Sequence, residues 1–389
     1  MNFAKRMSNL GTETAFEVLA RAKALEAQGK HIIHLQIGEP DFDTPKNIVD
    51  AGVRALQSGY THYTASPGMM EHRAAIAKDV SDSRGVQYKP ENVLVCPGAK
   101  PIMFFVILAL IDEGDEVIYP NPGFPIYESM IRFVNGKPVP ARLPEENDFV
   151  LDVDALVKSL TPKTKLLILN SPGNPTGGMI GKKEVERIAK ELQKFPNCYV
   201  LSDEIYRRIT YTNDGTPSIA AEPGMKDRTI ILDGYSKSYS MTGWRLGYGV
   251  MPEELTVACA RLQTNSTSCT AGFTQMAGIE AISGDQTSVT KMVAEFKKRR
   301  DFIVKGLNEI AGFTCRTPKG AFYVFPNTTG TGKKSKELEG LLLTEAGVAC
   351  LSGTSFGAFG EGYLRFSYAN SMENIGIAID RMKKLFGTK

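Results

Sequence analysis

The sequence has few histidines and no long apolar run, which argues against a histidine-rich metal site and against a membrane-spanning segment. Its 389 residues include only four histidines, at positions 31, 34, 62 and 72, and neither the 31/34 nor the 62/72 spacing matches a helical zinc pair with a third ligand. The longest apolar run covers residues 102–111, which is far short of the roughly 20 residues that span a bilayer. Residues 1–16 lack the apolar core of a signal peptide. We therefore expect a soluble, cytoplasmic protein that has no metal site and does not bind a membrane.

The cysteines give no sign of disulfide or metal-binding pairs, and the basic residues give no sign of a nucleic-acid site. The six cysteines form no Cys-x-x-Cys pair and have no histidine nearby, so buried free thiols are the better interpretation. The net charge of +3 favours no particular partner. The densest basic run, residues 297–300, has no interleaved aromatic residues and is typical of a solvated helix face. We expect no nucleic-acid partner.

Short apolar runs alternate with segments that are mostly long enough for a crossover helix. The runs cover residues 93–96, 116–119, 166–169, 199–201 and 229–232. This pattern predicts an α/β fold in which helices cover both faces of a mostly parallel sheet. Beyond residue 285 the pattern changes to a long charged helix and short strands. We therefore expect a large domain over residues 46–285 and a smaller α+β domain made of residues 1–45 and 286–389.

One lysine has neighbours that indicate chemistry. Lys237 follows the apolar run 229–232 and lies among small residues and the hydroxyls of Ser236, Ser238 and Tyr239, with Arg245 a little further on. Most lysines are solvated surface charges. An amine in this setting suits a Schiff base with a cofactor carbonyl, while the hydroxyls and the arginine hold a phosphate.

A second segment indicates an anion site. Gly98, Ala99 and Lys100 end an apolar run and lead, through Pro101, into an apolar helix over residues 102–110. A helix start of this kind offers free backbone N–H groups to a phosphate. By itself the segment is more often a plain turn between a strand and a helix.

Six motifs in order resemble the class I aminotransferases, the aspartate aminotransferase-like family of fold type I enzymes that depend on pyridoxal phosphate. They are Gln36-Ile37-Gly38-Glu39-Pro40-Asp41, Pro97-Gly98-Ala99-Lys100, Asn170-Ser171-Pro172-Gly173-Asn174-Pro175-Thr176-Gly177, Ser202-Asp203-Glu204-Ile205-Tyr206, the Lys237 stretch, and Tyr363-Leu364-Arg365-Phe366-Ser367-Tyr368. The resemblance covers nearly the whole chain. It implies a homodimer with composite active sites, and cis bonds before Pro122 and Pro175 are candidates by the same resemblance.

The resemblance also implies roles for individual residues. The implied cofactor-binding residues are Gly98, Ala99, Lys100, Phe124, Asn174, Asp203, Tyr206, Ser236, Lys237, Ser238 and Arg245, with Tyr63 reaching the phosphate of the other subunit. Lys237, Asp203 and Tyr206 are the implied catalytic group. Asp203 would keep the pyridine nitrogen protonated, and Tyr206 with Asn174 would bind the phenolic oxygen. The implied substrate-binding residues are Gly38, Asn174 and Arg365, because Arg365 lies in an apolar strand and needs an anion.

These roles predict transfer of the amino group of an L-amino acid to a 2-oxo acid by ping-pong kinetics, with 2-oxoglutarate as the expected acceptor. A lyase or a condensing or cyclising enzyme with the same fold and cofactor stays open, because the fold does not fix the reaction. A serine hydrolase is a weaker alternative. Residues 353–357 match its Gly-x-Ser-x-Gly elbow, but every histidine precedes Ser355. The preferred amino acid, the pathway and the role of residues 12–17 do not follow from the sequence.

Overall fold

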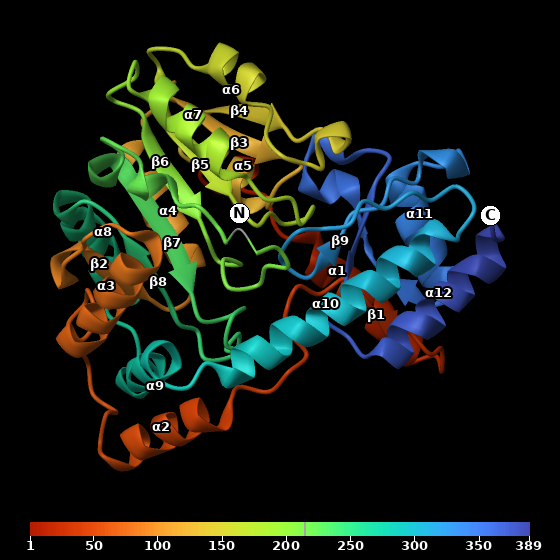
Figure 1. Ribbon diagram of the computed structural model, residues 1–389, viewed down its shortest axis with the longest axis horizontal. Helices are drawn as coiled ribbons and strands as arrows, with labels where there is room; N and C mark the ends of the chain where they lie inside the picture. The colour runs from red at the N-terminus through yellow and green to blue at the C-terminus, as the bar shows by residue number, and fades with distance from the viewer. Residues whose placement is uncertain (214) are drawn as a thin grey trace.

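A sheet of seven strands forms the centre of the larger part of the molecule. The computed structural model describes residues 1–213 and 215–389, and within them this sheet has the order β2-β8-β7-β6-β5-β3-β4 (Figure 1). The strands are β2 (Val93–Cys96), β3 (Glu116–Asn121), β4 (Lys137–Arg142), β5 (Thr164–Asn170), β6 (Tyr199–Asp203), β7 (Thr229–Gly234) and β8 (Gly247–Val250). β8 is antiparallel to both of its neighbours and the other pairings are parallel. The predicted α/β class and mostly parallel sheet are confirmed.

Two of these strands were not predicted, and each has a physical reason for its weak signal. β4 contains Pro138 and Pro140, which disfavour a strand assignment, but it is the edge strand of the sheet, where proline is tolerated. β8 is four residues long and includes two glycines, which have low strand propensity.

Helices bury both faces of the sheet. Leu94 and Cys96 of β2 pack in one cluster with α4 and α8, whereas Val93 and Val95 pack in another with α3 and α9. This alternation is the period of two expected of a strand buried on both sides. The helices of this part are α2 (Lys46–Gln57), α3 (Met70–Arg84), α4 (Lys100–Leu110), α5 (Ile126–Phe133), α6 (Val153–Ser159), α7 (Lys182–Leu192), α8 (Glu253–Ser266) and α9 (Gly272–Ser283).

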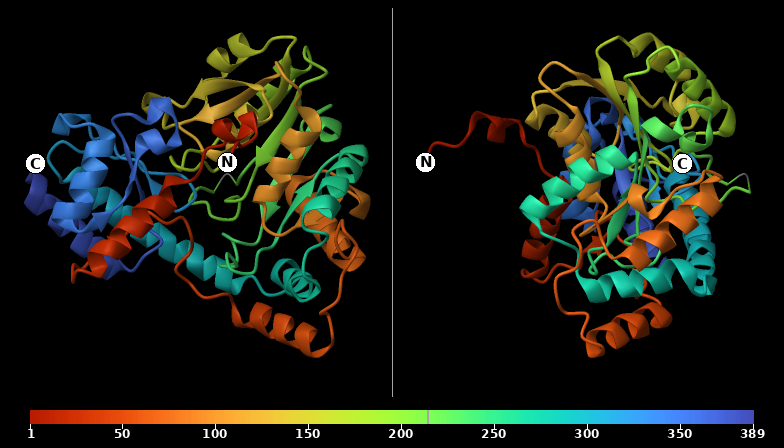
Figure 2. Two further views of the ribbon diagram at one scale, coloured as in Figure 1. Left: turned by 180° about the vertical axis from the view of Figure 1, so that it is seen from behind. Right: turned by 90° about the vertical axis from the view of Figure 1, so that its left-hand side faces the viewer.

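The smaller part joins the two ends of the chain. β1 (Ile33–His34) pairs in parallel with β10 (Val348–Ala349), and β11 (Leu351–Ser352), β12 (Leu364–Ser367) and β9 (Tyr323–Val324) form an antiparallel sheet. The helices are α1 (Thr14–Glu26), α10 (Thr287–Asn308), α11 (Ser335–Leu341) and α12 (Met372–Phe386). Figures 1 and 2 show α1 and β1 among the C-terminal elements. This arrangement supports, as a proposal, the division into residues 46–285 and residues 1–45 with 286–389.

Strand register brings the candidate residues to one edge of the central sheet. Asn170 of β5 pairs with Asp203 of β6, and Asp203 pairs with Leu232 of β7. The carboxyl ends of three neighbouring parallel strands therefore lie level, and Lys237 follows the third. Ligands of open parallel sheets bind beyond this edge. The bonds before Pro122 and Pro175 are cis as expected, and the bond before Pro172 is also cis, which was not predicted.

No helix within residues 1–213 and 215–389 has both the length and the apolar character needed to cross a membrane.

Candidate active site

A cavity of about 770 Å³ lies at the carboxyl ends of the strands and receives residues from both parts of the molecule. Most of the residues predicted from the sequence line it: Gly38, Ala99, Lys100, Phe124, Asn174, Asp203, Tyr206, Ser236, Lys237, Arg245 and Arg365. Three predicted residues, Gly98, Ser238 and Tyr63, do not line the cavity. Gly98 and Ser238 are buried, and Tyr63 is 90% exposed on the surface.

Lys237 lies in the turn between β7 and β8, and its amine points into the cavity. Nζ donates a hydrogen bond to the backbone carbonyl oxygen of Gly38. Loss of solvent around the amine lowers the pKa of Lys237 to about 8. The amine is thus more often neutral and nucleophilic than that of a surface lysine.

Asp203 ends β6 and is 7% exposed. Its Oδ2 accepts a hydrogen bond from Tyr127 Oη at 2.5 Å, and its Oδ1 accepts one from the backbone N–H of Ile205 at 3.2 Å. Burial raises the pKa of Asp203 to about 6 despite these donors. A cationic N–H at this carboxylate would stabilise its ionised form.

The start of α4 and the segment after Lys237 form an anion-binding corner. No side chain caps the N-terminus of α4. Ile102 N–H donates to the carbonyl oxygen of Ala99 and Pro101 has no N–H, so the N–H groups of Ala99 and Lys100 are the ones left for a ligand. Ser236 and Arg245 line the same cavity. Gly98 contributes by its lack of a side chain. It has φ +93°, and a Cβ there would lie 2.4 Å from Nη2 of Arg245.

Arg365 is a buried cation for which no carboxylate partner is found in residues 1–213 and 215–389. It is 4% exposed, and its Nη1 and Nη2 donate to Asn174 Oδ1 at 3.0 Å and to the carbonyl oxygen of Gln36 at 2.5 Å. Its Cζ lies 4.5 Å from the ring centroid of Tyr323 and 4.9 Å from that of Phe356. Burial lowers the pKa of Arg365, because the charged form loses solvation. A bound anion would compensate this charge.

Several contacts of the cavity were not predicted from the sequence. Tyr127 holds Asp203, and Tyr323 Oη lies 2.8 Å from Tyr206 Oη. A Cβ at Gly38 would lie 2.4 Å from Tyr323 Oη, so only glycine lets the chain pass there. Glu13 forms an ion pair with Lys100 at the cavity wall. Tyr127 and Tyr323 lie in apolar segments that resemble ordinary core, so the sequence carries no signal for them.

The comparisons with known proteins agree with this geometry. Residues 30–382 match the family model described as Aminotransferase class I and II. The chain belongs to this family. This aminotransferase is 38% identical to an aspartate aminotransferase of Geobacillus stearothermophilus over 99% of its own length and 98% of the relative. It is 36% identical to an aspartate/prephenate aminotransferase of Nitrosomonas europaea over 99% and 100%.

Solved structures give the same result. The aspartate aminotransferase of Rhizobium meliloti superimposes with a TM-score of 0.94 at 36% identity, covering 98% of each chain. That of Thermus thermophilus, solved with maleate, has a TM-score of 0.94 at 33% identity and covers 99% of this aminotransferase and all of the other chain. The chain is therefore an aminotransferase of fold type I that depends on pyridoxal phosphate.

The residues of the cavity fit that cofactor. Asp203 is a buried carboxylate that needs a cationic donor, and the uncapped start of α4 with Arg245 offers donors for a phosphate. Lys237 presents a half-buried amine of lowered pKa between them. The cavity thus offers a separate partner for the ring nitrogen, the aldehyde and the phosphate of pyridoxal phosphate.

Proposed function

We propose that this aminotransferase transfers the amino group of an L-amino acid to a 2-oxo acid by ping-pong kinetics, with the residue roles expected from the sequence. The position of Arg365 is the observation that supports an amino acid as the substrate. Arg365 presents a buried guanidinium in the same cavity as Lys237 and Asp203, and within the described part of the chain it pairs with no carboxylate, which suits the α-carboxylate of an amino acid. The lyase and condensing alternatives are not favoured, because the relatives are aminotransferases.

Bound pyridoxal phosphate supplies an aldehyde that takes up the amino group and a protonated ring that accepts electrons. Lys237 would hold the aldehyde carbon, and once the substrate amine replaces it, the free amine would move the proton from the substrate Cα. Asp203, oriented by Tyr127, would hold the ring nitrogen protonated. Tyr206 and Asn174 would bind the phenolic oxygen, and Phe124 would cover the ring.

The phosphate would be bound by Ala99, Lys100, Ser236 and Arg245, which line the cavity. Gly98 and Ser238, which the resemblance also assigns to the phosphate, do not line it. Gly98 would make room for Arg245, and Ser238, which is 2% exposed, would shape the turn that carries Lys237. The carboxylate of the substrate would bind Arg365 between Asn174 and the backbone of Gly38.

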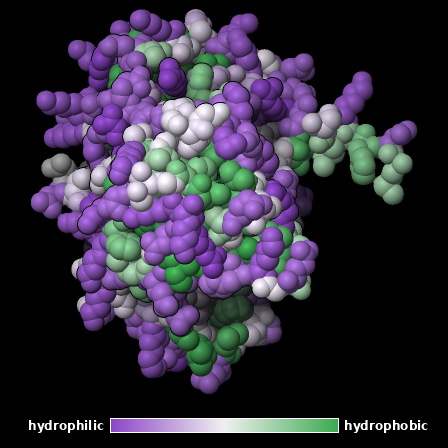
Figure 3. Space-filling model, turned by 90° about the vertical axis from the view of Figure 1, so that its right-hand side faces the viewer, coloured by the Kyte–Doolittle hydropathy of each residue, from purple (hydrophilic) through white to green (hydrophobic). Residues whose placement is uncertain are grey.

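We also propose a homodimer. Tyr63 lies outside the cavity of its own chain and is 90% exposed, which supports a contact with the phosphate of a second copy. The N-terminal segment projects from the body of the molecule (Figures 2 and 3) and carries exposed apolar side chains, including Met1 and Phe3. A second copy would cover these groups.

The proposed amino-group pair is glutamate and 2-oxoglutarate. Lys100 is half-exposed on the cavity wall and pairs with Glu13, so it could exchange Glu13 for the distal carboxylate of a ligand. Relatives named for aspartate, prephenate, aromatic and alanine substrates support a family role but no single donor. A cytoplasmic location is proposed because all six cysteines are free thiols, as in a reducing compartment.

The first prediction tests the reaction. With one L-amino acid and no acceptor, the cofactor spectrum should change once, near one equivalent of amino acid per site, and stop. Addition of 2-oxoglutarate should restore the starting spectrum. Stopped-flow absorbance and an ammonia assay over a panel of amino acids provide the measurement. Continuous ammonia release without an acceptor would instead identify a lyase.

A further inference from the structure

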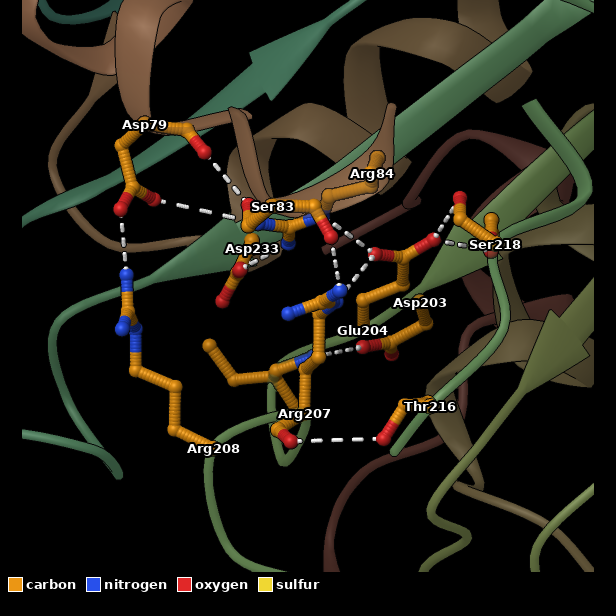
Figure 4. Close-up of polar contacts among 12 residues, drawn as sticks. Asp79, Ser83, Arg84, Asp203, Glu204, Arg207, Arg208, Thr216, Ser218 and Asp233 are labelled. Atoms are coloured by element: carbon orange, nitrogen blue, oxygen red, sulfur yellow. Dashed lines mark hydrogen bonds and ion pairs between the residues drawn. The ribbon is translucent and has the colours of Figure 1, made fainter. Parts of the chain in front are cut away.

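A buried network of charged side chains lies behind the cavity, where α3 meets the ends of β6 and β7 (Figure 4). Arg84, the last residue of α3, is its centre, and its side chain is 1% exposed. Nε of Arg84 donates to Glu204 Oε2 at 2.9 Å, and Nη2 donates to Asp233 Oδ2 at 2.6 Å. One planar guanidinium therefore binds two carboxylates, Glu204 directly after β6 and Asp233 near the end of β7.

Other groups of the network donate further hydrogen bonds to these two carboxylates. Glu204 Oε1 accepts hydrogen bonds from Ser202 and Ser218 at 3.0 and 2.6 Å. Asp233 accepts from Tyr248 Oη at 3.3 Å and from the N–H of Gly234 at 2.7 Å. Arg84 is the cation that the two buried carboxylates share. Glu204 also has Arg207, whose Nε lies 3.8 Å from Oε2, whereas within the described residues Asp233 pairs with Arg84 alone. Removal of Arg84 would therefore leave Asp233 uncompensated and Glu204 with only the more distant cation.

Both carboxylates are close in sequence to residues of the active site. Glu204 directly follows Asp203, and its N–H donates to the carbonyl oxygen of Leu232 at 2.8 Å. Asp233 follows Leu232 near the end of β7, and the turn that carries Lys237 begins directly after this strand. Arg84 thus ties together the two chain segments that place Asp203 and Lys237.

We infer that Arg84 is a positioning residue, which fixes the Asp203 carboxylate relative to the Lys237 amine by holding Glu204 and Asp233 with one guanidinium. The inference rests on the proposed roles of Asp203 and Lys237. Lysine cannot replace arginine here, because a single ammonium group lacks the two-pronged geometry.

The network also acts on Asp203 through its charge. Burial is the main reason that the pKa of Asp203 is raised, and the negative charges of Asp233 and Glu204 raise it further. The hydrogen bonds from Tyr127 of α5 and from the N–H of Ile205 oppose this. By balancing the two network carboxylates, Arg84 limits their repulsion of an ionised Asp203.

The experiment compares Arg84→Lys with the same change at another buried arginine. Arg228 precedes β7, at the end of that strand away from Lys237, and its Nη1 donates to the carbonyl oxygens of Leu192 and Phe195 at 2.9 and 3.0 Å. Arg228→Lys therefore makes the same substitution at a buried site without loosening the segments of Asp203 and Lys237. Each variant is assayed for kcat and KM at saturating cofactor, for affinity of the apoprotein for pyridoxal phosphate, and for thermal unfolding.

We expect Arg84→Lys to lower kcat by about tenfold to a hundredfold, as a small misplacement of reacting groups does. KM should change much less, and cofactor affinity should fall. Arg228→Lys should lower the unfolding temperature and leave kcat and cofactor affinity nearly unchanged. Equal losses in the two variants would reduce Arg84 to a general stability role and overturn the inference.

A second variant keeps the inference testable if Arg84→Lys fails to fold. Glu204→Gln keeps the size of the side chain and removes a charge that raises the pKa of Asp203. The pH at which the apoprotein loses cofactor affinity on acidification should then move to a lower value. If this pH is the same in Glu204→Gln and in the wild type, the inference is contradicted. If wild-type apoprotein does not attach pyridoxal phosphate to Lys237 at all, the proposed function fails, whatever the variants do.

Discussion

At the level of single residues, burial shifts the pKa values of two groups of opposite charge toward their neutral forms. Burial lowers the pKa of Lys237 to about 8 and raises that of Asp203 to about 6, because each charged form loses solvation in the same cavity. Without cofactor, the protein therefore carries partly uncompensated charges near neutral pH. Opposed shifts of this kind are typical of functional sites rather than of structural ion pairs.

The Asp203 carboxylate should make the apoprotein less stable at neutral pH. Its pKa is 3.8 in an unfolded chain and about 6 in the folded protein, which corresponds to about 3 kcal/mol. The folded pKa is the higher one, so this cost is absent below about pH 4, develops as the pH rises from about 4 to 6, and is complete at pH 7.

We therefore predict that Asp203→Asn stabilises the apoprotein by up to about 3 kcal/mol at pH 7 and by little at pH 4. The same change should lower transamination by on the order of a hundredfold or more, because the ring nitrogen loses its ionised partner. Urea unfolding at the two pH values measures the first effect and steady-state rates measure the second. An equal gain at both pH values would mean that desolvation of the charge is not the cause.

At the scale of the element, the join between β2 and α4 depends on backbone geometry. α4 starts without a side-chain cap, which leaves the N–H groups of Ala99 and Lys100 to a ligand, and Gly98 at φ +93° lets the guanidinium of Arg245 lie against the chain. The helix start and the arginine can thus act on one anion. A larger residue at position 98 would separate them.

We predict that Gly98→Ala weakens binding of pyridoxal phosphate more than it weakens folding. The matched control is Gly114→Ala, since Gly114 also has a positive φ, +88°, but no atom lies within 4 Å of its added Cβ. Both variants should lose about 1 kcal/mol of stability from backbone strain. Only Gly98→Ala should displace Arg245 and raise the dissociation constant of the cofactor, measured by titration of the apoprotein. The same affinity loss in both variants would contradict this role.

At the scale of the whole molecule, the cavity is closed by residues from both ends of the chain. Gly38 and Glu13 come from the N-terminal segment, Arg365 comes from β12, and Lys237 and Asp203 come from the central sheet. Any shift of the smaller part against the sheet would change the distance between Arg365 and Lys237. In the proposed homodimer, the exposed Tyr63 and the projecting N-terminal segment would contact a second copy of the chain.

If two copies share their active sites, a variant with weakened cofactor binding and a variant without Lys237 should complement each other when they are mixed. Tyr63→Phe should weaken cofactor binding, although Tyr63 does not line the cavity of its own chain. Lys237→Ala should abolish covalent attachment. When the two variants are mixed and allowed to exchange subunits, one site of each hybrid regains both Lys237 and Tyr63, so tight binding and activity should return.

Sedimentation should show twice the mass of one chain in the active sample. An active monomer, or a mixture that never exceeds its separate components, would contradict a composite site.

Local sequence patterns predict the strands that carry the site and most of the residues at their ends. Short apolar runs, turn residues and the Lys237 stretch are local signals, and their order identified the family. Which distant side chains meet could not be predicted in this way. Arg365 and Gln36 are 329 residues apart, and Arg84 binds both Glu204, which follows β6, and Asp233 of β7. Contacts between distant segments depend on how helices and sheet pack, and no local pattern in the chain encodes them.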